Sequence, residues 1–263
     1  VYNQHADLVA YDNTILKARN VIGAYNPESK RRVLLCAHWD SRPYADQDAD
    51  KTKHHSPILG VNDGASGVGV LLEVARQLQQ QAPAIGIDII FFDAEDYGIP
   101  YFYQGAYKND TWCLGSQYWG RVPHVDGYNA RYGILLDMVG GRDARFNREM
   151  ISDMVGGKNA TFYKEQFSQR TAGKYVNKIW NTAHRLGFGN FFPKEKGTEV
   201  TDDHMYVYNL RQIPCVDIIN YDPNCDTGFG DFWHTIDDTM DIIDKGTLNA
   251  VGQTLLEVIY NEK

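Results

Sequence analysis

The sequence predicts an α/β fold, a three-layer α/β/α sandwich with a central mixed, mainly parallel sheet. Strand-like runs alternate with helical patterns along the chain, and the later runs are almost continuously apolar. Alternation is typical of a parallel sheet with helices on its faces, and uninterrupted apolar runs are typical of strands buried on both faces. With 263 residues, 43% of them hydrophobic, the chain can form one large domain over residues 1–263.

The strands are expected in four places. Residues 20–41 predict two strands joined by the turn-forming residues 26–29, and therefore an antiparallel hairpin. Residues 84–96 contain a continuously apolar run, which predicts a buried and central strand. Residues 132–141 repeat that form and end in two glycines, and residues 212–220 predict a further strand.

Three helices are predicted from apolar residues at three- and four-residue steps. The positions that define them are Val68, Leu71, Leu72, Ala75 and Leu78; Val176, Ile179, Trp180, Ala183 and Leu186; and Val251, Leu255, Val258 and Ile259. The long stretches 97–130 and 187–203, rich in Gly, Pro and aromatic residues, are predicted to be loops that shape a pocket.

Charge and composition exclude several classes of partner. The formal net charge is -8 and no block of five like charges occurs, so neither nucleic acid nor an anionic membrane surface is an expected partner. No apolar stretch approaches the roughly 18 residues of a spanning helix, so no membrane-spanning segment is expected.

The four cysteines have no CxxC spacing, which argues against a thiolate zinc site and against a disulfide-dense scaffold. Cys36 and Cys215 lie inside apolar runs and are expected to be buried small hydrophobes. Cys113 and Cys225 lie in polar stretches, and a disulfide between them stays open because sequence does not supply the geometry of a bridge.

Acidic and histidine residues recur where apolar strands stop. They are His38 with Asp40, Asp63, Glu95 with Asp96, Asp137, and His234. Taken singly, Asp63 has an ordinary explanation as a helix cap or turn former, and His234 as a hydrogen-bonded core or surface histidine. In a parallel sheet, however, these strand ends face one edge and their side chains can reach a common point, where crowded carboxylates need a cation.

The segment "FFDAEDYG", residues 91–98, places three acids directly after an apolar run. Two carboxylates and one neutral imidazole, with a water in the fourth position, form an open zinc site. Neighbouring residues on a strand or tight turn point in different directions, so if one of Glu95 and Asp96 holds the metal, the other is free to move protons beside it. Asp93 is then expected to be structural, as a cap or hydrogen-bond acceptor.

Together the motifs resemble those of the glutaminyl cyclase branch of the zinc aminopeptidase-like (M28) superfamily. They are "LLCAHWDS", "GVNDGASGVGVLLEVAR", "DIIFFDAED", "YGILLDMVG", "TDDHMYV" and "FWHTIDDT", which cover nearly the whole chain. The resemblance implies a zinc aminopeptidase-like fold and one zinc ion per chain, held by Asp63, Asp96 and His234. Animal members have Glu where this chain has Asp96, whereas bacterial-type members look like this sequence.

The resemblance also implies roles for residues around the metal. Glu95 is the implied general base and acid, and Asp202 and Asp137 belong to a carboxylate network beside it. Trp233 and Phe229 match aromatic positions that wall the substrate pocket, although core packing is the alternative for both. A pocket tryptophan of the animal members has no clear match here, and Trp112 and Tyr101 are the candidates.

The implied reaction converts the N-terminal glutamine of a peptide or protein into pyroglutamate and releases ammonia. Zinc polarises the γ-amide and Glu95 shuttles the proton. The resemblance further implies an exported chain, periplasmic or secreted.

Two other functions are consistent with the same residues. A two-metal aminopeptidase would use His38 and Asp137 as further ligands, and both are present. A catalytically silent binding protein of the same fold is the other alternative. The "TDDH" motif together with Trp233 directly before His234 favours the cyclase.

Overall fold

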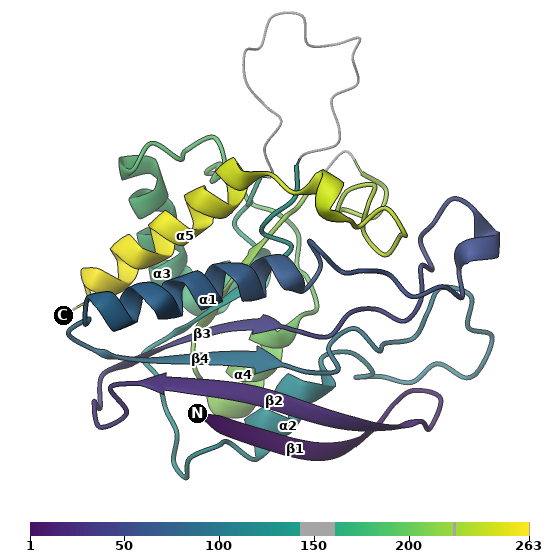
Figure 1. The fold of residues 1–263 in the computed structure, drawn as a ribbon, viewed down its shortest axis with the longest axis horizontal. Coiled ribbons are helices and arrows are strands. Elements are labelled where there is room, and N and C mark those ends of the chain that lie inside the picture. The colour runs from purple at the N-terminus through teal and green to yellow at the C-terminus, as the bar shows by residue number, and fades with distance from the viewer. Residues whose placement is uncertain (143–160, 223–224, 263) are drawn as a thin grey trace, which may run out of the picture.

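The computed structural model describes residues 1–142, 161–222 and 225–262. A six-stranded sheet lies between layers of helices (Figure 1). The strands are β1 (Tyr2–Val9), β2 (Ile15–Tyr25), β3 (Arg32–His38), β4 (Gly86–Phe92), β5 (Gly133–Asp137) and β6 (Cys215–Ile219), in the spatial order β1-β2-β4-β3-β5-β6. The pairs β4–β3, β3–β5 and β5–β6 are parallel, whereas β1–β2 and β2–β4 are antiparallel. The predicted mixed, mainly parallel sheet is confirmed.

The hairpin predicted for residues 20–41 is wrong, because β4 lies between β2 and β3. Val21 of β2 pairs with Phe91 of β4, and Leu35 of β3 pairs with Ile89 of β4. The largely apolar β4 takes the central position that buries both of its faces, and its one charged residue, Asp88, pairs with Arg32. The hairpin is formed instead by β1 and β2, whose turn is closed by the Thr14 carbonyl accepting from the Ala10 N–H at 2.9 Å.

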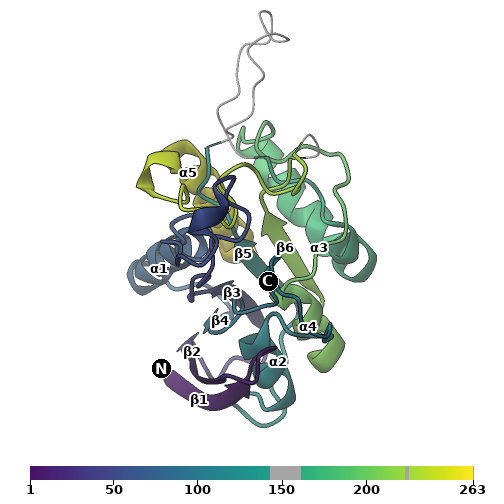
Figure 2. The same cartoon turned by 90° about the vertical axis from the view of Figure 1, so that its right-hand side faces the viewer.

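Alternation along the strands divides the core into two layers. Val33, Leu35 and Ala37 of β3 face one layer, and Leu34 and Cys36 face the other. The first layer is covered by α1 (Ala65–Gln80), α3 (Gln166–Arg185) and α5 (Lys245–Tyr260), and the second by α2 (Leu114–Arg121) and α4 (Asp203–Arg211). Figure 2 shows α1 and α5 on one side of the sheet and α2 and α4 on the other. Helices on both faces explain why every residue of β3 is buried.

The three predicted helices are confirmed as α1, α3 and α5, although Leu72 and Leu186 are exposed and lie outside the packed stripes. The short helices α2 and α4 were not predicted, and α2 interrupts the loop expected over residues 97–130.

The expectations for the cysteines are resolved by burial and pairing. Cys36 and Cys215 are buried in the core, as expected. Cys113 and Cys225 are both free thiols, so the disulfide that the sequence left undecided does not form. Within the described ranges, no helix is long and apolar enough to cross a membrane.

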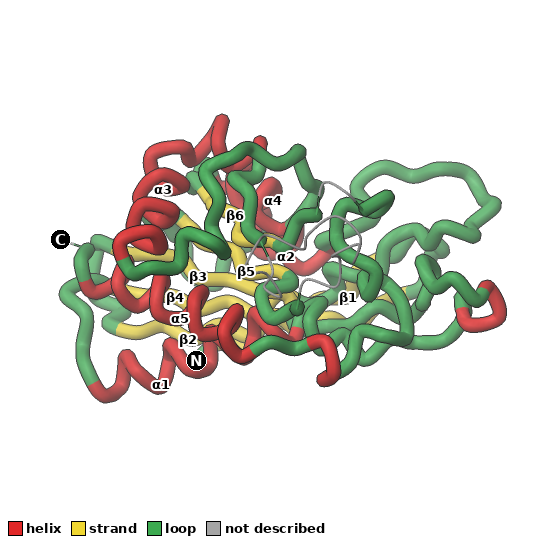
Figure 3. The backbone as a smooth tube through the Cα atoms, turned by 90° about the horizontal axis from the view of Figure 1, so that it is seen from above, coloured by secondary structure: helices red, strands yellow, loops and turns green. Residues whose placement is uncertain are grey.

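The carboxyl ends of β3, β4, β5 and β6 lie at one edge of the sheet, because these strands are mutually parallel. Long loops gather beyond the strands, as Figure 3 shows from above. The loop that follows β3 and the segment that follows β4 both start at this edge. Functional residues on separate loops are therefore brought to one place.

Glu165 caps α3, and its contacts predict a contribution to the free energy of unfolding that is lost in acid. Its carboxylate accepts hydrogen bonds from the N–H groups of Phe167 and Ser168 and lies 3.2 Å from Nε2 of His204. Burial alone would raise the pKa of Glu165, but His204 and Ser168 outweigh it and lower the pKa to about 2.

The stabilisation is therefore present above the ordinary pKa of a glutamate and is lost as the pH falls toward 2. We expect Glu165→Gln to lower the free energy of unfolding by about 2 kcal/mol at pH 7 and by much less near pH 2.5. Urea unfolding at both pH values tests this, and an equal loss at both would contradict it.

Candidate active site

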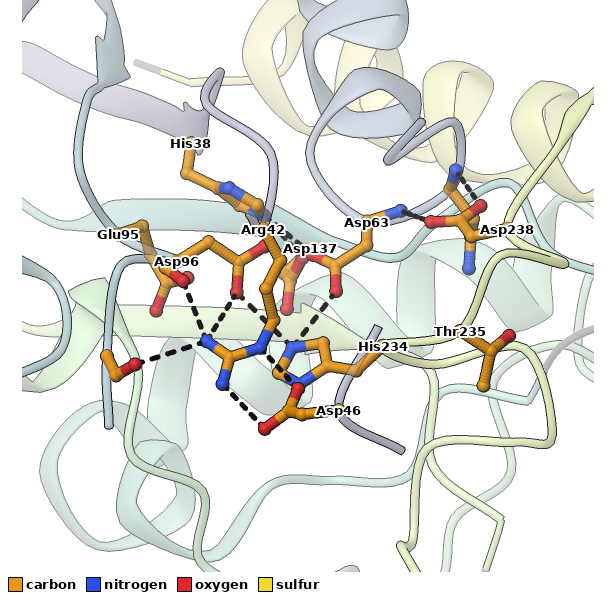
Figure 4. Close-up of polar contacts among 12 residues, drawn as sticks. His38, Arg42, Asp46, Asp63, Glu95, Asp96, Asp137, His234, Thr235 and Asp238 are labelled. Atoms are coloured by element: carbon orange, nitrogen blue, oxygen red, sulfur yellow. Dashed lines mark hydrogen bonds and ion pairs between the residues drawn. The ribbon is translucent and has the colours of Figure 1, made fainter. Parts of the chain in front are cut away.

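The three predicted metal ligands come together at the carboxyl edge of the sheet. Asp63 precedes α1, Asp96 follows β4, and His234 lies in the loop between β6 and α5. Nε2 of His234 is 3.2 Å from Oδ1 of Asp96 and 3.6 Å from Oδ2 of Asp63 (Figure 4). All three side chains are buried, and each offers a donor atom within 4.8 Å of the other two. This arrangement can surround a single ion.

The donor atoms fit a zinc ion. Oδ2 of Asp63 and Oδ2 of Asp96 are buried and have no hydrogen-bond partner among the residues that the structure describes, which is costly unless a cation satisfies them. Burial, together with the charge of Asp96, raises the pKa of Asp63 to about 7. One imidazole nitrogen and two carboxylate oxygens form a donor set that zinc accepts, with room for a further ligand.

Two further carboxylates hold the turns that carry the proposed ligands. Asp238 accepts from the N–H groups of Asn62 and Asp63 at 2.7 and 3.0 Å. Asp40 accepts from the N–H groups of Glu95 and Asp96 at 3.1 and 3.0 Å. Each carboxylate therefore fixes two consecutive backbone groups beside a proposed ligand.

We expect Asp238→Asn to weaken zinc binding without removing a ligand. The amide has one acceptor oxygen, so it cannot accept from both N–H groups, and the Asp63 turn loosens. Losses of about 10- to 100-fold in metal affinity are typical for such outer residues. Competition with a chromophoric chelator measures the affinity. Asp237→Asn, at the exposed neighbouring position, is the matched control, and equal affinities for the two variants would contradict the role of Asp238.

A buried arginine fixes the His234 side of the site. Oδ1 of Asp46 lies 3.5 Å from Nδ1 of His234, and Arg42 binds both oxygens of Asp46 at 2.7 and 2.8 Å. Arg42 also donates to the Asp96 carbonyl at 2.8 Å. A partner on Nδ1 orients the imidazole so that Nε2 points toward Asp63 and Asp96. Sequence reasoning missed Arg42 and Asp46, because they lie in a loop and carry no strand-end signal.

Glu95 stands beside the ligand group and lines the same cavity. Burial raises its pKa well above the usual range; His38 opposes the shift, and the charges of Asp96 and Asp202 add to it. A carboxylate oxygen of Asp202 lies within 4.8 Å of a carboxylate oxygen of Glu95. Glu95 and Asp96 therefore occupy different positions around the site, as their adjacency predicted.

Asp93 has the expected structural position, since its oxygens accept from the N–H groups of Arg19 and Ala94 at 2.7 and 2.9 Å.

His38 bridges two carboxylates and contacts Oδ1 of Asp63, whereas His234 lies near Oδ2. Nε2 of His38 lies 3.0 Å from Oδ1 of Asp63 and 3.2 Å from Oδ1 of Asp137. The donor atoms of His38, Asp63 and Asp137 also lie within 4.8 Å of one another, which makes a second potential metal-binding group.

A cavity of 380 Å³ is lined by the three proposed ligands together with Glu95 and Asp137. Trp233, Phe229 and Trp112 are among its walls. The ring of His234 stacks against Trp233 and Trp112, with centroid distances of 3.7 and 5.9 Å. Tyr101 is 79% exposed and lies outside the lining, so of the two aromatic candidates Trp112 faces the site.

A second cavity, of 480 Å³, lies between α1 and α5 and has a mostly apolar lining. It is the larger of the two, but its lining contains none of the predicted site residues. We assign the chemistry to the smaller cavity because the acids and histidines converge there.

A buried polar cluster behind Asp202 was not predicted. His204 lies between Glu165, at 3.2 Å from Nε2, and Asp217, at 3.6 Å from Nδ1. Burial and the charge of Asp202 raise the pKa of Asp217 well above its usual range. The sequence did contain one indication of this cluster, because Asp217 is an acidic residue inside the otherwise apolar run of β6.

Comparisons with known proteins place the chain in a family. Residues 20–259 match the family model described as Peptidase family M28. The chain is 24% identical over 253 residues to glutaminyl-peptide cyclotransferase from Bos taurus, which covers 90% of this chain and 64% of the bovine protein. The chain thus spans about two thirds or less of the length of that curated relative.

Solved structures of bacterial proteins are more similar to this chain than the bovine protein is. Bacteroides thetaiotaomicron glutaminyl cyclase, solved with N-acetylhistamine bound, is 58% identical with a TM-score of 0.91, covering 100% of this chain and 84% of that one. A protein described as a Zn-dependent exopeptidase from Parabacteroides distasonis ATCC 8503 is 56% identical with a TM-score of 0.92, covering 99% of this chain and 84% of that one.

Proposed function

The chain belongs to peptidase family M28, and on that basis we propose that it is a zinc-dependent glutaminyl-peptide cyclotransferase. The proposed substrates are peptides or proteins with an N-terminal glutamine, and the products are pyroglutamate and ammonia. The observation that carries the proposal is the 58% identity to a solved glutaminyl cyclase over 100% of this chain. The convergence of Asp63, Asp96, His234 and Glu95 on one cavity supports it independently.

Asp63, Asp96 and His234 are the proposed ligands of one zinc ion per chain. When bound, zinc supplies a Lewis acid that polarises the γ-amide carbonyl of the glutamine. Arg42, Asp46 and the backbone hydrogen bonds to Asp238 hold these ligands before substrate arrives. Such pre-organisation avoids reorganisation of the site during the reaction.

Glu95 is the proposed proton carrier. It takes a proton from the attacking α-amine and delivers one to the departing nitrogen, which leaves as ammonia. Its raised pKa favours this double role, because a carboxylate of higher proton affinity is a stronger base near neutral pH. Amine and amide belong to the same residue, so closure of a five-membered ring supplies the proximity.

The remaining cavity residues favour this substrate. Asp137 and Asp202 line the cavity close to Glu95, whereas no Lys or Arg occurs among its described lining residues. Carboxyl oxygens in this lining can accept hydrogen bonds from the N–H groups of the peptide's terminal amine. Trp112, Trp233 and Phe229 are proposed to exclude water and so suppress hydrolysis of the same amide.

The test is ammonia release from a glutamine-initiated dipeptide, measured with and without a chelator. We expect release that stops on chelation and resumes when zinc is added. No release by the zinc-loaded protein from any glutamine-initiated peptide would refute the proposed function.

An aminopeptidase is the second candidate, and the His38–Asp63–Asp137 group favours it because it offers a second metal position. The Zn-dependent exopeptidase from Parabacteroides distasonis is similar enough to keep this candidate in view. Metal stoichiometry and product analysis separate the two: two metals and a free amino acid indicate the peptidase. Bound zinc without turnover of either substrate class indicates a silent binding protein.

The proposal treats residues 1–263 as one catalytic domain and places the chain outside the cytoplasm, periplasmic or secreted. Both points follow from the family resemblance. Fractionation of the native cells, followed by detection of the chain, tests the location.

A further inference from the structure

Cys113 contacts the proposed proton carrier, and nothing in the proposed mechanism so far uses it. The side chain is fully buried at the start of α2. Its Sγ donates a hydrogen bond to Oε1 of Glu95 at 3.0 Å, a contact between residues 18 positions apart. Sγ, a Glu95 oxygen and an Asp202 oxygen all lie within 4.8 Å of one another.

The backbone conformation and hydrogen bonds around Cys113 direct its side chain toward Glu95. Cys113 adopts a left-handed conformation with a φ of 57°, which is uncommon for a residue with a side chain. Its N–H donates to the Glu95 carbonyl at 3.0 Å, and the N–H of Leu114 donates to the Ala94 carbonyl at 3.0 Å. The start of α2 is therefore bonded directly to the segment that carries Glu95. Strained backbone of this kind persists where surrounding contacts hold it in place.

The thiol is a donor and not a nucleophile. Burial raises the pKa of Cys113 well above its usual range, and the negative charge of Glu95 adds to the shift. The sulfur thus keeps its proton, and a neutral S–H can donate to a carboxylate. A thiolate next to Glu95 would instead repel it, so the geometry is useful only with the proton on sulfur.

We propose that Cys113 is a positioning residue for Glu95, its S–H holding Oε1 so that the other carboxylate oxygen is presented to the substrate amine. This inference rests on the proposed function. Sulfur holds Oε1 of the Glu95 side chain, and Asp40 holds the Glu95 backbone N–H, so both the carboxylate and the backbone that carries it are fixed. A carboxylate held in one orientation loses less freedom when it takes the proton.

Kinetics of three variants test the role. Cys113→Ala removes the donor, and we expect kcat on a glutamine-initiated peptide to fall about 10-fold or more, with KM within about 2-fold. Cys113→Ser restores a donor, and we expect kcat within about 3-fold of the native protein. Cys36→Ala removes another buried thiol, whose sulfur contacts the Ile134 carbonyl and not Glu95, and is the matched control for core effects. Equal kcat for Cys113→Ala and Cys113→Ser would overturn the proposal.

A spectroscopic readout decides the contact whether or not the protein cyclises glutamine. The infrared S–H stretch of Cys113 is identified as the band missing in Cys113→Ser, and we expect it at the low frequency of a hydrogen-bonded thiol. We expect Glu95→Leu, which removes the acceptor, to shift the band upward, while Glu199→Leu leaves it in place. A band that does not respond to Glu95→Leu would overturn the positioning role. Absent cyclisation together with a responsive band would refute the proposed function alone.

Discussion

Replacing Glu95 by glutamine is expected to lower kcat by about 10²- to 10⁴-fold, the usual loss when a general base is removed. The amide keeps nearly the same shape but cannot accept the proton of the attacking amine. Because Asp63, Asp96 and His234 are unchanged, the variant should bind zinc as the native protein does, and KM should change little. Steady-state ammonia release and zinc content by atomic absorption measure the two properties.

Glu199→Gln is the matched control, since Glu199 lines the same cavity but pairs with Arg170 on the surface. We expect it to retain nearly full turnover. If Glu95→Gln turned over glutamine peptides at the native rate, Glu95 would not be the proton carrier.

Replacing Asp63 by asparagine is expected to abolish both zinc binding and turnover. The amide has no charge to hold the cation, and we expect activity at micromolar zinc to fall by more than about 100-fold. The native protein should gain about 4 kcal/mol of stability at a zinc concentration 1,000 times Kd. The variant should gain almost none, because it does not bind the ion.

The stabilities of the metal-free native protein and of metal-free Asp63→Asn provide a second comparison. Burial and the charge of nearby Asp96 raise the pKa of Asp63, so a neutral amide at this position relieves an unfavourable burial of charge. Metal-free Asp63→Asn should therefore be at least as stable as the metal-free native protein. Thermal unfolding with and without zinc tests both points. Asp126→Asn, at an exposed position away from the cavity, is the control. A native-sized zinc stabilisation in Asp63→Asn would exclude Asp63 as a ligand.

The layers of the fold were predictable because buried strands are apolar along most of their length and packed helices carry apolar residues at three- and four-residue steps. β4 is apolar except for Asp88, and its position in the sheet is central, as its composition predicts. Strand order was not predictable in the same way. The turn-forming residues 26–29 favour a hairpin locally, but pairing is decided by which strand best fills the space beside β2, and β4 does so from a distance in sequence. The short α2 and α4 lack the repeated steps that identify a longer amphipathic helix.

The site was predictable where polar residues interrupt apolar strands. Asp63, Asp96 and His234 were placed together from strand ends and family resemblance, and the structure brings their donor atoms together. The residues that hold them were not found, because Arg42 and Asp46 lie in a loop and act through hydrogen bonds that only the folded chain creates. Cys113 was predicted as a loop thiol with a bridge left open, whereas its contact with Glu95 depends on a left-handed backbone conformation.

The most direct test of the central claim is a crystal structure of the zinc-loaded protein with anomalous diffraction at the zinc edge. We predict one strong peak, about 2.0–2.2 Å from the nearest donor atoms of Asp63, Asp96 and His234. Glu95 should lie beside this peak without binding it. A peak away from these three side chains would contradict the ligand assignment. Two equally occupied peaks, the second between His38 and Asp137, would contradict the single-metal cyclase and favour the peptidase.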